Sequence, residues 1–277
     1  MYNYKNIFKI RTKKNVDKYA FFLDIDNTLW KHGVIPDINK ETIKQVRALG
    51  HKVFINTGRS YAFIPQKLFD EIELDGVVSG IGATIRMDGE IVEKKYLSRE
   101  DLIYIYELCK DKGNGIFFEG EYKTIFYDRK DQDNPRFFFD DDGKRVFFDA
   151  DEWKKKHINE PISKVTVHGF IPTEEQAKEL SSRFVLIPQM VDNYTEIGTI
   201  GYDKAKGMLR VAQILGIDRS HCVAMGDSPN DISMLEAAGI SVAMGDAYDE
   251  VKDICDIVSV NCADGGVAHA MKQILKI

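Results

Sequence analysis

The sequence has few cysteines and no cysteine motif. Only four of the 277 residues are cysteines, and none of them forms a Cys-x-x-Cys pair or has a histidine at zinc-finger spacing. This pattern argues against a zinc finger. We expect buried, reduced thiols of a cytosolic protein at Cys109, Cys222, Cys255 and Cys262.

Long apolar runs are also missing. No stretch approaches the roughly 18 apolar residues of a membrane span. The first 18 residues lack the uninterrupted apolar core of a secretory signal. They carry basic side chains instead, at Lys5, Lys9, Arg11, Lys13, Lys14 and Lys18. We therefore expect a cytoplasmic protein with no membrane partner, in which residues 1–18 form a basic N-terminal extension.

The chain has no excess of positive charge and none of several common catalytic motifs. Its net charge of −6 argues against a nucleic-acid partner, because phosphate backbones attract a basic face. No P-loop, nucleophilic serine elbow or dinucleotide-binding fingerprint is present. With 44% hydrophobic and 30% charged residues, the composition is that of a globular protein of one or two domains.

Two carboxylates follow an apolar run near the start of the chain. Residues 19–23 are apolar throughout, which predicts a strand buried on both faces, and Asp24 and Asp26 come where that strand ends. Taken alone, the pair fits a simple Asx turn as well as it fits a site. The rest of the chain has to decide between the two interpretations.

Strand and helix patterns alternate after this pair. Residues 37–49 have helical spacing, with Asp37 or Asn39 available as a cap, and residues 53–55 form a second apolar strand that runs into Thr57 and Gly58. A helix is predicted over 60–73, with Pro65 as a kink or as a sign of a later start. The strand–helix–strand order predicts a right-handed parallel unit.

The pattern changes between residues 85 and 188. Hairpin-like alternation surrounds Asp88-Gly89, and two helices are predicted with capping boxes that begin at Ser98 and Thr173. An acidic stretch over 128–142 lacks the glycine and the terminal glutamate of a calcium-binding EF-hand, so we expect a solvated loop. Hairpins mixed with two helices indicate an α+β module inserted into the parallel one.

The parallel pattern then resumes and supplies more polar strand ends. A helix opens near Lys206, and the strand 222–225 runs into Gly226 and Asp227, with Asn230 and Asp231 close behind. The carboxyl ends of parallel strands meet at one edge of a sheet, where α/β proteins bind ligands. A carboxylate cluster with few histidines suits Mg²⁺, and a hydroxyl, backbone N–H groups and a lysine beside it suit phosphate.

Four segments together resemble a known family. They are Asp24-Ile25-Asp26-Asn27-Thr28-Leu29, Asn56-Thr57-Gly58-Arg59, Lys206-Gly207 and Gly226-Asp227-Ser228-Pro229-Asn230-Asp231. In this order they are similar to the four motifs of the haloacid dehalogenase superfamily, and the inserted module resembles the large cap of its Cof-like sugar-phosphatase branch. The resemblance implies an α/β fold: a doubly wound, Rossmann-like parallel sheet as the catalytic core (19–84 and 189–277) and an α+β cap domain (85–188).

The resemblance also implies a role for each matching residue. Asp24 would be the nucleophile that forms an aspartyl-phosphate, and Asp26 the general acid and base, with a pKa above that of Asp24. Thr57, Gly58, Lys206 and Asn230 would bind the phosphate. Mg²⁺ would be held by Asp24, Asp227, Asp231 and the backbone oxygen of Asp26.

Some points stay open at this stage. Lys204 competes with Lys206, which we favour because Gly207 follows it. Asn27 stands where this branch more usually has glycine, but asparagine tolerates a left-handed backbone. Arg59 fits either a phosphate contact or an ion pair.

The expected function is a Mg²⁺-dependent phosphatase acting on a small phosphorylated metabolite, sugar phosphates first. We expect a monomer or a weak homodimer. A phosphomutase or phosphotransferase using the same intermediate is the alternative, and a non-catalytic interaction module is the alternative from another class.

Overall fold

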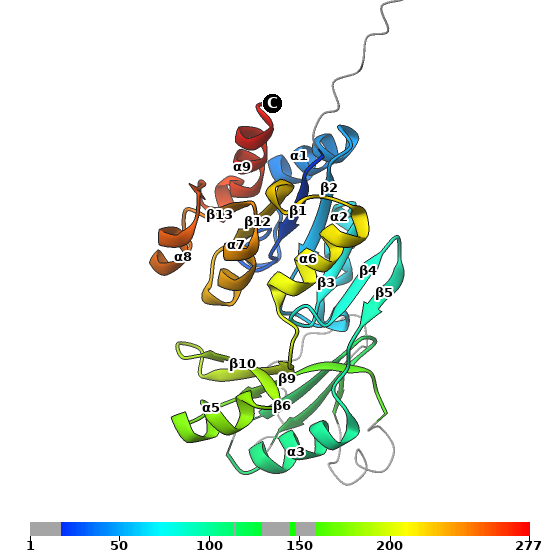
Figure 1. The fold of residues 1–277 in the computed structure, drawn as a ribbon, viewed down its shortest axis with the longest axis vertical. Helices are drawn as coiled ribbons and strands as arrows, with labels where there is room; N and C mark the ends of the chain where they lie inside the picture. Colours follow the sequence, from blue (N-terminus) through cyan, green and yellow to red (C-terminus); the bar gives the residue numbers. More distant parts are fainter. Residues whose placement is uncertain (1–17, 113–114, 129–144, 148–158) are drawn as a thin grey trace, which may run out of the picture.

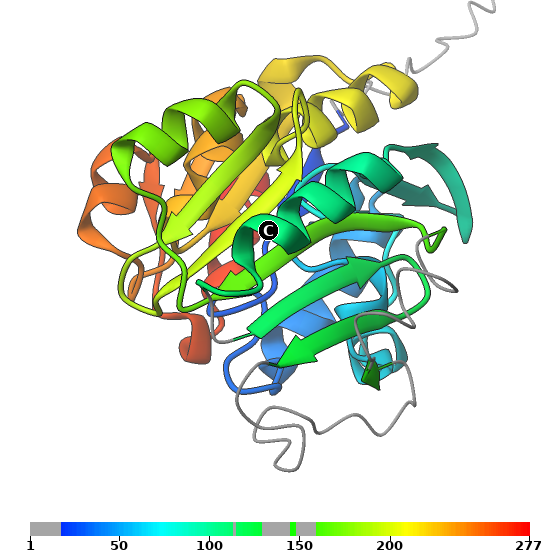
Figure 2. The ribbon, with the colours of Figure 1, turned by 90° about the horizontal axis from the view of Figure 1, so that it is seen from below.

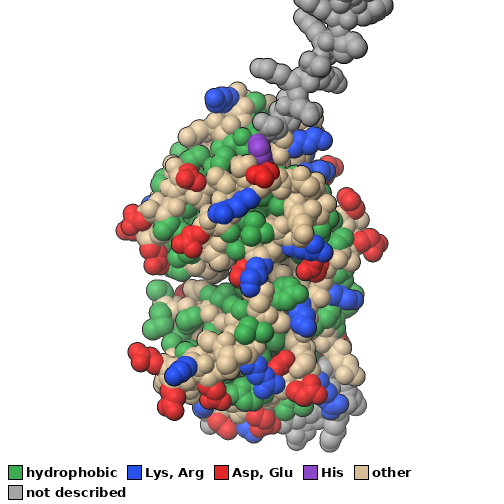
Figure 3. Space-filling model, viewed as in Figure 1, with side chains coloured by type: hydrophobic (Ala, Val, Ile, Leu, Met, Phe, Trp, Pro, Cys, Tyr) green, Lys and Arg blue, Asp and Glu red, His purple; other side chains and the backbone are tan. Residues whose placement is uncertain are grey.

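The structure is a computed structural model that describes residues 18–112, 115–128, 145–147 and 159–277. Residues 1–17 of the predicted basic extension lie outside the described residues, as does nearly all of the acidic stretch 128–142. The chain forms two layered units, one above the other in Figure 1. On the face seen in Figure 3, the outline is notched between them.

The upper unit, here called the core, is built on an eight-stranded sheet. Across the sheet the order is β14-β13-β12-β1-β2-β3-β4-β5, with parallel pairing from β14 to β3 and antiparallel pairing for the last two strands. The strands are β1 (Ala20–Leu23), β2 (Lys52–Asn56), β3 (Gly76–Ser79), β4 (Thr84–Met87), β5 (Glu90–Lys94), β12 (Cys222–Gly226), β13 (Ile240–Ala243) and β14 (Ile257–Val258).

Helices cover both faces of this sheet. Helix α1 packs against α9, and α6 packs against α7 on the opposite face (Figure 1). The core helices are α1 (Asp37–Ala48), α2 (Gln66–Glu71), α6 (Lys204–Leu215), α7 (Ile232–Ala237), α8 (Asp249–Ile254) and α9 (Gly266–Leu275). The short 3₁₀ turns are η1 (Tyr61–Phe63), η2 (Arg219–His221), η3 (Pro229–Asp231) and η4 (Cys262–Asp264).

Coverage of both faces explains the apolar character of the central strands. All four residues of β1 are fully buried, as predicted for a strand with helices on each side. Phe22 of β1 lies opposite Phe54 of β2 in the register, and their rings stack with centroids 5.4 Å apart. This packing fixes the register of β1 on β2. It thereby fixes the position of the residues that follow β1.

The lower unit, here called the cap, has its own sheet and its own hydrophobic cluster. Its strand order is β10-β11-β9-β6-β7-β8, antiparallel except for the β7–β8 pair. The strands are β6 (Gly115–Gly120), β7 (Thr124–Asp128), β8 (Arg145–Phe147), β9 (Ile162–His168), β10 (Phe184–Gln189) and β11 (Tyr194–Thr199). Helices α3 (Arg99–Cys109) and α5 (Glu174–Ser181) lie side by side on the sheet face remote from the core (Figures 1 and 2).

The predicted boundaries between the two units were wrong at both ends. Strands β4 and β5, placed in the cap from residue 85, extend the core sheet, because β4 pairs with β3 from Ser79↔Thr84 to Gly76↔Met87. Strand β11, placed in the core from residue 189, pairs with β9 and β10 in the cap sheet. Two short connections therefore join the units, near residues 95–98 and 200–203.

The local signals for helix starts were right in two cases and wrong in one, and in a fourth case the structure confirms the later start that Pro65 had left open. Ser98 with Asp101, and Thr173 with Gln176, form the predicted capping boxes. Neither Asp37 nor Asn39 caps α1, which begins after Pro36; the Asn39 side chain instead bonds Leu29 and Ala268. The helix predicted over 60–73 is a 3₁₀ turn followed by α2, which starts after Pro65 as a proline at that point favours.

Within the described residues, no helix combines the length and the apolar character needed to cross a bilayer.

The stacked rings at the centre of the core generate a stability prediction. Phe54→Ala removes a fully buried ring, so we expect it to lower the free energy of unfolding by about 3–5 kcal/mol. Leu49→Ala, at a side chain that is 53% exposed, is the control and should change that free energy by about 0.5 kcal/mol or less. Urea denaturation followed by far-UV circular dichroism measures both. Equal effects of the two substitutions would contradict this packing.

Candidate active site

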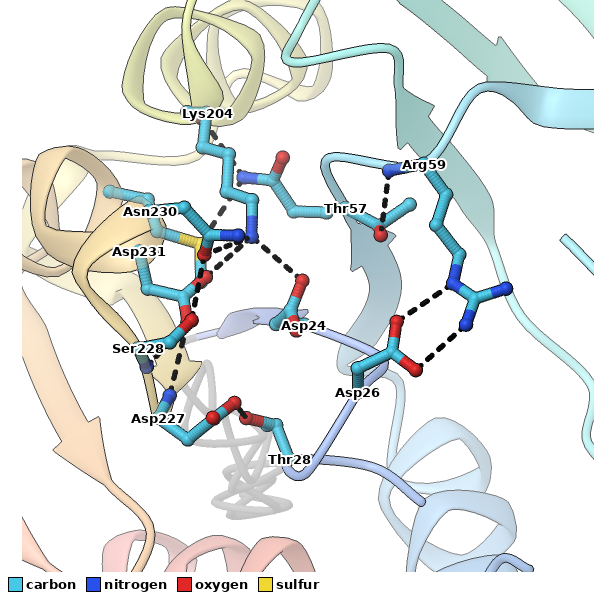
Figure 4. Close-up of polar contacts among 12 residues, drawn as sticks. Asp24, Asp26, Thr28, Thr57, Arg59, Lys204, Asp227, Ser228, Asn230 and Asp231 are labelled. Atoms are coloured by element: carbon cyan, nitrogen blue, oxygen red, sulfur yellow. Dashed lines mark hydrogen bonds and ion pairs between the residues drawn. The ribbon is translucent and has the colours of Figure 1, made fainter. Parts of the chain in front are cut away.

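Three neighbouring strands end at the same edge of the core sheet and bring three predicted residues together. Strand β1 lies between β2 and β12, with Leu23 in register with Ile55 and Met225. The chain beyond these strands carries Asp24, Thr57 and Asp227, which are all at most 5% exposed. Figure 4 shows their side chains converging on one space at the carboxyl edge of the sheet, the expected ligand position in an open α/β fold.

A buried lysine joins the ends of these strands. The Nζ of Lys204 donates to Oδ1 of Asp24 at 2.7 Å, to Oδ1 of Asp231 at 2.5 Å and to Oδ1 of Asn230 at 3.2 Å. The side chain is 2% exposed, and the carboxylates raise the pKa of its ammonium despite the opposing effect of burial. Lys204 therefore stays charged and connects β1 with the segment after β12.

The preference for Lys206 as this lysine was wrong. Helix α6 begins at Lys204, with the Asp203 side chain accepting from the N–H of Lys206, so it is Lys204 that points back to the strand ends. Lys206 lines a separate surface depression beside Arg210. Gly207 has another reason to be a glycine: a Cβ there would lie 2.4 Å from Cγ1 of Val78, so it permits close helix–sheet packing.

Three carboxylates gather beside Lys204. Asp24, Asp227 and Asp231 each offer an oxygen, and these atoms lie within 4.8 Å of one another. Burial, and then the negative charge of Asp231, raise the pKa of Asp24 to about 7 against the opposing effect of Lys204. Burial, Asp231 and Asp24 raise the pKa of Asp227 to about 8. The single positive charge of Lys204 does not balance the negative charges of three carboxylates.

The donor set fits a magnesium ion. Oδ1 of Asp24 is bonded to Lys204, and Oδ1 of Asp227 accepts from Thr28 at 2.8 Å, while the Oδ2 atoms of both carboxylates accept no hydrogen bond from the described residues. Hard carboxylate oxygens of this kind are what Mg²⁺ prefers. Both carboxylate oxygens of Asp231 already accept hydrogen bonds, one from Lys204 and the other from the N–H groups of Asp227 and Ser228. Asp231 therefore orients Lys204 and the start of the segment after β12.

Asp26 is held apart from the triad by Arg59. Its two carboxylate oxygens accept from Nε and Nη2 of Arg59 at 2.7 and 2.8 Å, and Oδ1 also accepts from Nε1 of Trp30 at 3.1 Å. Figure 4 shows this carboxylate turned towards Arg59 and away from Asp24. Arg59, for which the sequence left two roles open, makes an ion pair.

This ion pair reverses the predicted order of the two pKa values. We expected Asp26 to have a higher pKa than Asp24. Burial does favour the neutral acid of Asp26, but the Arg59 contacts outweigh it and hold its pKa below the usual range. Asp24, more deeply buried and beside Asp231, has the higher pKa.

The turn after Asp26 has the conformation that Asn27 was expected to tolerate. Asn27 has φ +54°, in the left-handed region, and the N–H groups of Leu29 and Trp30 both bond the carbonyl of Ile25 at 3.0 Å. The turn directs Thr28 to Asp227 and Trp30 to Asp26. It therefore fixes a carboxylate on each side of Asp24.

A cavity of about 450 Å³ opens above these residues, between the core and the cap. Among the predicted site residues, its lining includes Asp24, Asp26, Thr57, Gly58, Asn230 and Asp227. Asp231 lies behind them, fully buried. The volume is that of a pocket for a small molecule.

The cap contributes residues that sequence reasoning missed. Its wall includes Glu119, Lys164 and Glu196, each less than 10% exposed. The available signal was the alternation along β9, where Lys164, Thr166 and His168 share one face between apolar neighbours. A polar face on a buried strand indicates that something polar lies against it.

The raised pKa values give a prediction for metal binding. At about pH 6, Asp24 and Asp227 hold protons, which they release as the pH rises through about 7 to 8, and only the charged carboxylates bind a cation well. We therefore expect Mg²⁺ to raise the melting temperature more at about pH 8.5 than at about pH 6, compared at each pH with metal-free protein.

Differential scanning fluorimetry tests this. Asp227→Asn should lose most of the Mg²⁺-dependent shift, whereas Glu73→Gln, at a side chain that is 92% exposed and pairs with Arg47, should keep it. An equal shift at both pH values, or a shift retained by Asp227→Asn, would contradict the assignment of this metal site.

Comparison with known proteins places this geometry in a family. A profile of the haloacid dehalogenase-like hydrolases matches residues 21–271. The chain is 26% identical to the putative phosphatase YkrA of Bacillus subtilis (strain 168), over 94% of this chain and 98% of the relative. It is 29% identical to the 5-amino-6-(5-phospho-D-ribitylamino)uracil phosphatase YwtE of the same organism, over 91% and 96% respectively.

A solved structure agrees in fold. The HAD subclass IIB sugar phosphatase BT4131 superposes with a TM-score of 0.77 at 28% identity, covering 94% of this chain and all of that one. Family profile, sequence relatives and fold agree over almost the whole described chain. The protein therefore belongs to the haloacid dehalogenase-like hydrolase family, as the resemblance of its sequence predicted.

Proposed function

We propose that this hydrolase is a Mg²⁺-dependent phosphatase that acts on small phosphorylated metabolites, and that sugar phosphates are its main substrates. The observation that carries the proposal is the convergence of Asp24, Lys204 and Asp227 beneath a cavity of small-molecule size. A carboxylate nucleophile, a buried ammonium and a cation site are the groups that phosphoryl transfer requires.

In the proposed reaction a carboxylate oxygen of Asp24 attacks phosphorus while Lys204 holds the side chain in place. The bond from phosphorus to the ester oxygen breaks, and the leaving alkoxide takes a proton from Asp26, which can carry that proton once it leaves part of its Arg59 pair and its pKa rises. Water then attacks the phosphorus of the aspartyl-phosphate and gives a proton to Asp26. The bond between phosphorus and the Asp24 oxygen breaks, and inorganic phosphate is released. Bound Mg²⁺ would be held by Asp24 and Asp227 and would neutralise the charge that develops on the phosphoryl oxygens.

The remaining residues of the cavity orient the phosphoryl group in this proposal. Thr57 and Gly58 follow β2, Asn230 follows β12, and all three line the cavity on the side of Asp24. Lys204 holds the Asp24 carboxylate in place and contributes its positive charge beside the phosphoryl group. Arg59 acts on Asp26: its bidentate ion pair sets the direction of that carboxylate, and Asp26 has to leave part of this pair to reach the leaving group.

The substrate class is supported by the relatives and by the cavity. One relative is named for a phosphorylated ribitylamino compound, and the solved neighbour is a sugar phosphatase. Both involve phosphate on a polyhydroxylated carbon chain. We also propose that the protein works in the cytoplasm as a monomer or a weak homodimer; the four cysteines, all of them free, are consistent with a reducing compartment.

Asp24→Asn is the direct test of the nucleophile. The amide keeps the size of the side chain but cannot form the acyl phosphate, so release of phosphate from sugar phosphates, nucleotides, pyridoxal phosphate and flavin mononucleotide with Mg²⁺ should fall to background. A colorimetric phosphate assay measures this. If Asp24→Asn retains the activity of the parent protein, the nucleophile is another group. If hexose monophosphates react without releasing phosphate, the protein is not a phosphatase.

The two neighbouring lysines form a matched pair for a second test. Lys204→Met removes the ammonium that contacts Asp24, so we expect phosphate release to fall by about 10²–10³-fold, the usual effect of removing one electrostatic stabiliser. Lys206→Met changes the same kind of side chain on the same helix, outside the cavity, and should keep the activity of the parent. The reverse result would restore Lys206 as the lysine of the site.

A further inference from the structure

One face of the cap sheet is turned to the cavity, and its residues alternate with those of the cap's hydrophobic cluster. Ile116, Phe118, Val165, Val167 and Ile197 point to the helices and build that cluster. The residues between them line the cavity: Phe117, Glu119, Lys164, Thr166, His168, Tyr194 and Glu196. Most of the described cap residues that line the cavity therefore come from three strands, β6, β9 and β11, and Gln189 of β10 and Asp192 of the loop after it add to them.

The centre of this face is a charged cluster. Nζ of Lys164 contacts Oε1 of Glu196 and lies 3.3 Å from Oε1 of Glu119, and Thr166 donates to the same Glu119 oxygen at 2.5 Å. The register pairs Lys164 with Glu119 on β6 and with Gly198, two residues from Glu196, on β11. Two carboxylates against one ammonium leave the cluster with net negative charge.

One atom of this cluster has no partner among the described residues. Oε2 of Glu196 is buried and accepts no hydrogen bond there. It lies at the boundary with the core: a Cβ placed on Gly58 would be 3.6 Å from this oxygen and 3.9 Å from Nδ2 of Asn230. Glu196 therefore opens onto the cavity next to the residues proposed to bind phosphate. A buried carboxylate oxygen without a donor favours a ligand that supplies one.

The surroundings limit what that ligand carries. The cavity wall also includes Asp192 at the rim and the rings of Phe117, His168 and Tyr194, of which the last two lie 5.3 Å apart. Aromatic rings pack against carbon chains or sugar rings, and the acids repel a second negative charge. Lys164 offers no free positive charge to such an anion, because Glu119 and Glu196 both engage it.

We propose that Glu196, oriented by Lys164, is a specificity-determining residue that accepts a hydrogen bond from a hydroxyl of the leaving group. The cap thereby selects neutral polyhydroxylated leaving groups over anionic ones. This inference rests on the proposed phosphatase function, which it deepens by naming the chemistry of the leaving group.

The test uses three phosphate monoesters, of which the first two differ only at the end of the chain remote from the phosphate. Sorbitol 6-phosphate has a neutral polyol leaving group, 6-phosphogluconate has a carboxylate on a chain of the same length, and propyl phosphate has no hydroxyl. For the parent protein we expect kcat/KM for sorbitol 6-phosphate to exceed that for each of the other two by about tenfold or more.

Glu196→Gln keeps the shape of the side chain and removes its charge. We expect the ratio of kcat/KM for sorbitol 6-phosphate to that for propyl phosphate to fall by about tenfold to hundredfold. The ratio of kcat/KM for sorbitol 6-phosphate to that for 6-phosphogluconate should also fall. Glu93→Gln is the matched control, since Glu93 pairs with Arg210 outside the cavity, and both ratios should keep their parent values.

Other outcomes overturn the inference in distinguishable ways. A purely structural cluster would lower kcat/KM for all three probes by the same factor in Glu196→Gln and leave the ratios unchanged. A parent protein that prefers 6-phosphogluconate would refute the selection against anions. If no probe releases phosphate in a reaction that Asp24→Asn abolishes, the proposed function itself fails, and that result is separate from any change in the ratios.

Discussion

The site depends on one buried ammonium group. Lys204 donates to Asp24, Asp231 and Asn230 from the first residue of α6, a helix that packs on the sheet through Gly207. A lone lysine at this depth would be costly, and so would the carboxylates without it, so each side stabilises the charge of the other. The lysine does not fully balance three acids. The remaining negative charge fits the three carboxylates at the carboxyl edge of the sheet to hold a cation.

The rest of the core fixes the ends of this network. Helices on both faces bury β1, β2 and β12 completely or nearly so, and their registers bring Asp24, Thr57 and Asp227 to one level. The left-handed turn at Asn27 then directs Thr28 to Asp227 and Trp30 to Asp26. Packing far from the chemistry therefore sets the spacing of the reactive groups. The cap closes the space above them with a second, separately packed unit.

Much of this arrangement could be predicted from the sequence, because the relevant signals are local. Apolar strands that end in polar residues indicated Asp24, Thr57 and Asp227, and Ser98 and Thr173 indicated two helix starts. Lys206 was preferred over Lys204 because Gly207 follows it, but that glycine serves the packing of the helix on the sheet. Sequence cannot show which of two such lysines faces the strands.

The other differences come from contacts between distant segments. Arg59 reaches Asp26 across 33 residues, and this ion pair reversed the predicted pKa order. Lys164 and Glu196 come together only when β9 and β11 pair. The apolar and polar residues of a hairpin alternate in the same way whichever sheet the hairpin joins. That is why the boundaries of the cap were misplaced at β4, β5 and β11, and why the cap's charged cluster was missed.

The central claim is that Asp24 becomes phosphorylated during turnover. Borohydride reduces an acyl phosphate to the alcohol, so quenching the protein with borohydride while it turns over a sugar phosphate with Mg²⁺ converts the phosphorylated aspartate to homoserine. Mass spectrometry of the digested protein then locates the reduced position. The account predicts reduction at Asp24, dependent on substrate and absent in Asp24→Asn. Reduction at Asp26 or Asp227, or rapid phosphate release with no reduced aspartate, would contradict it.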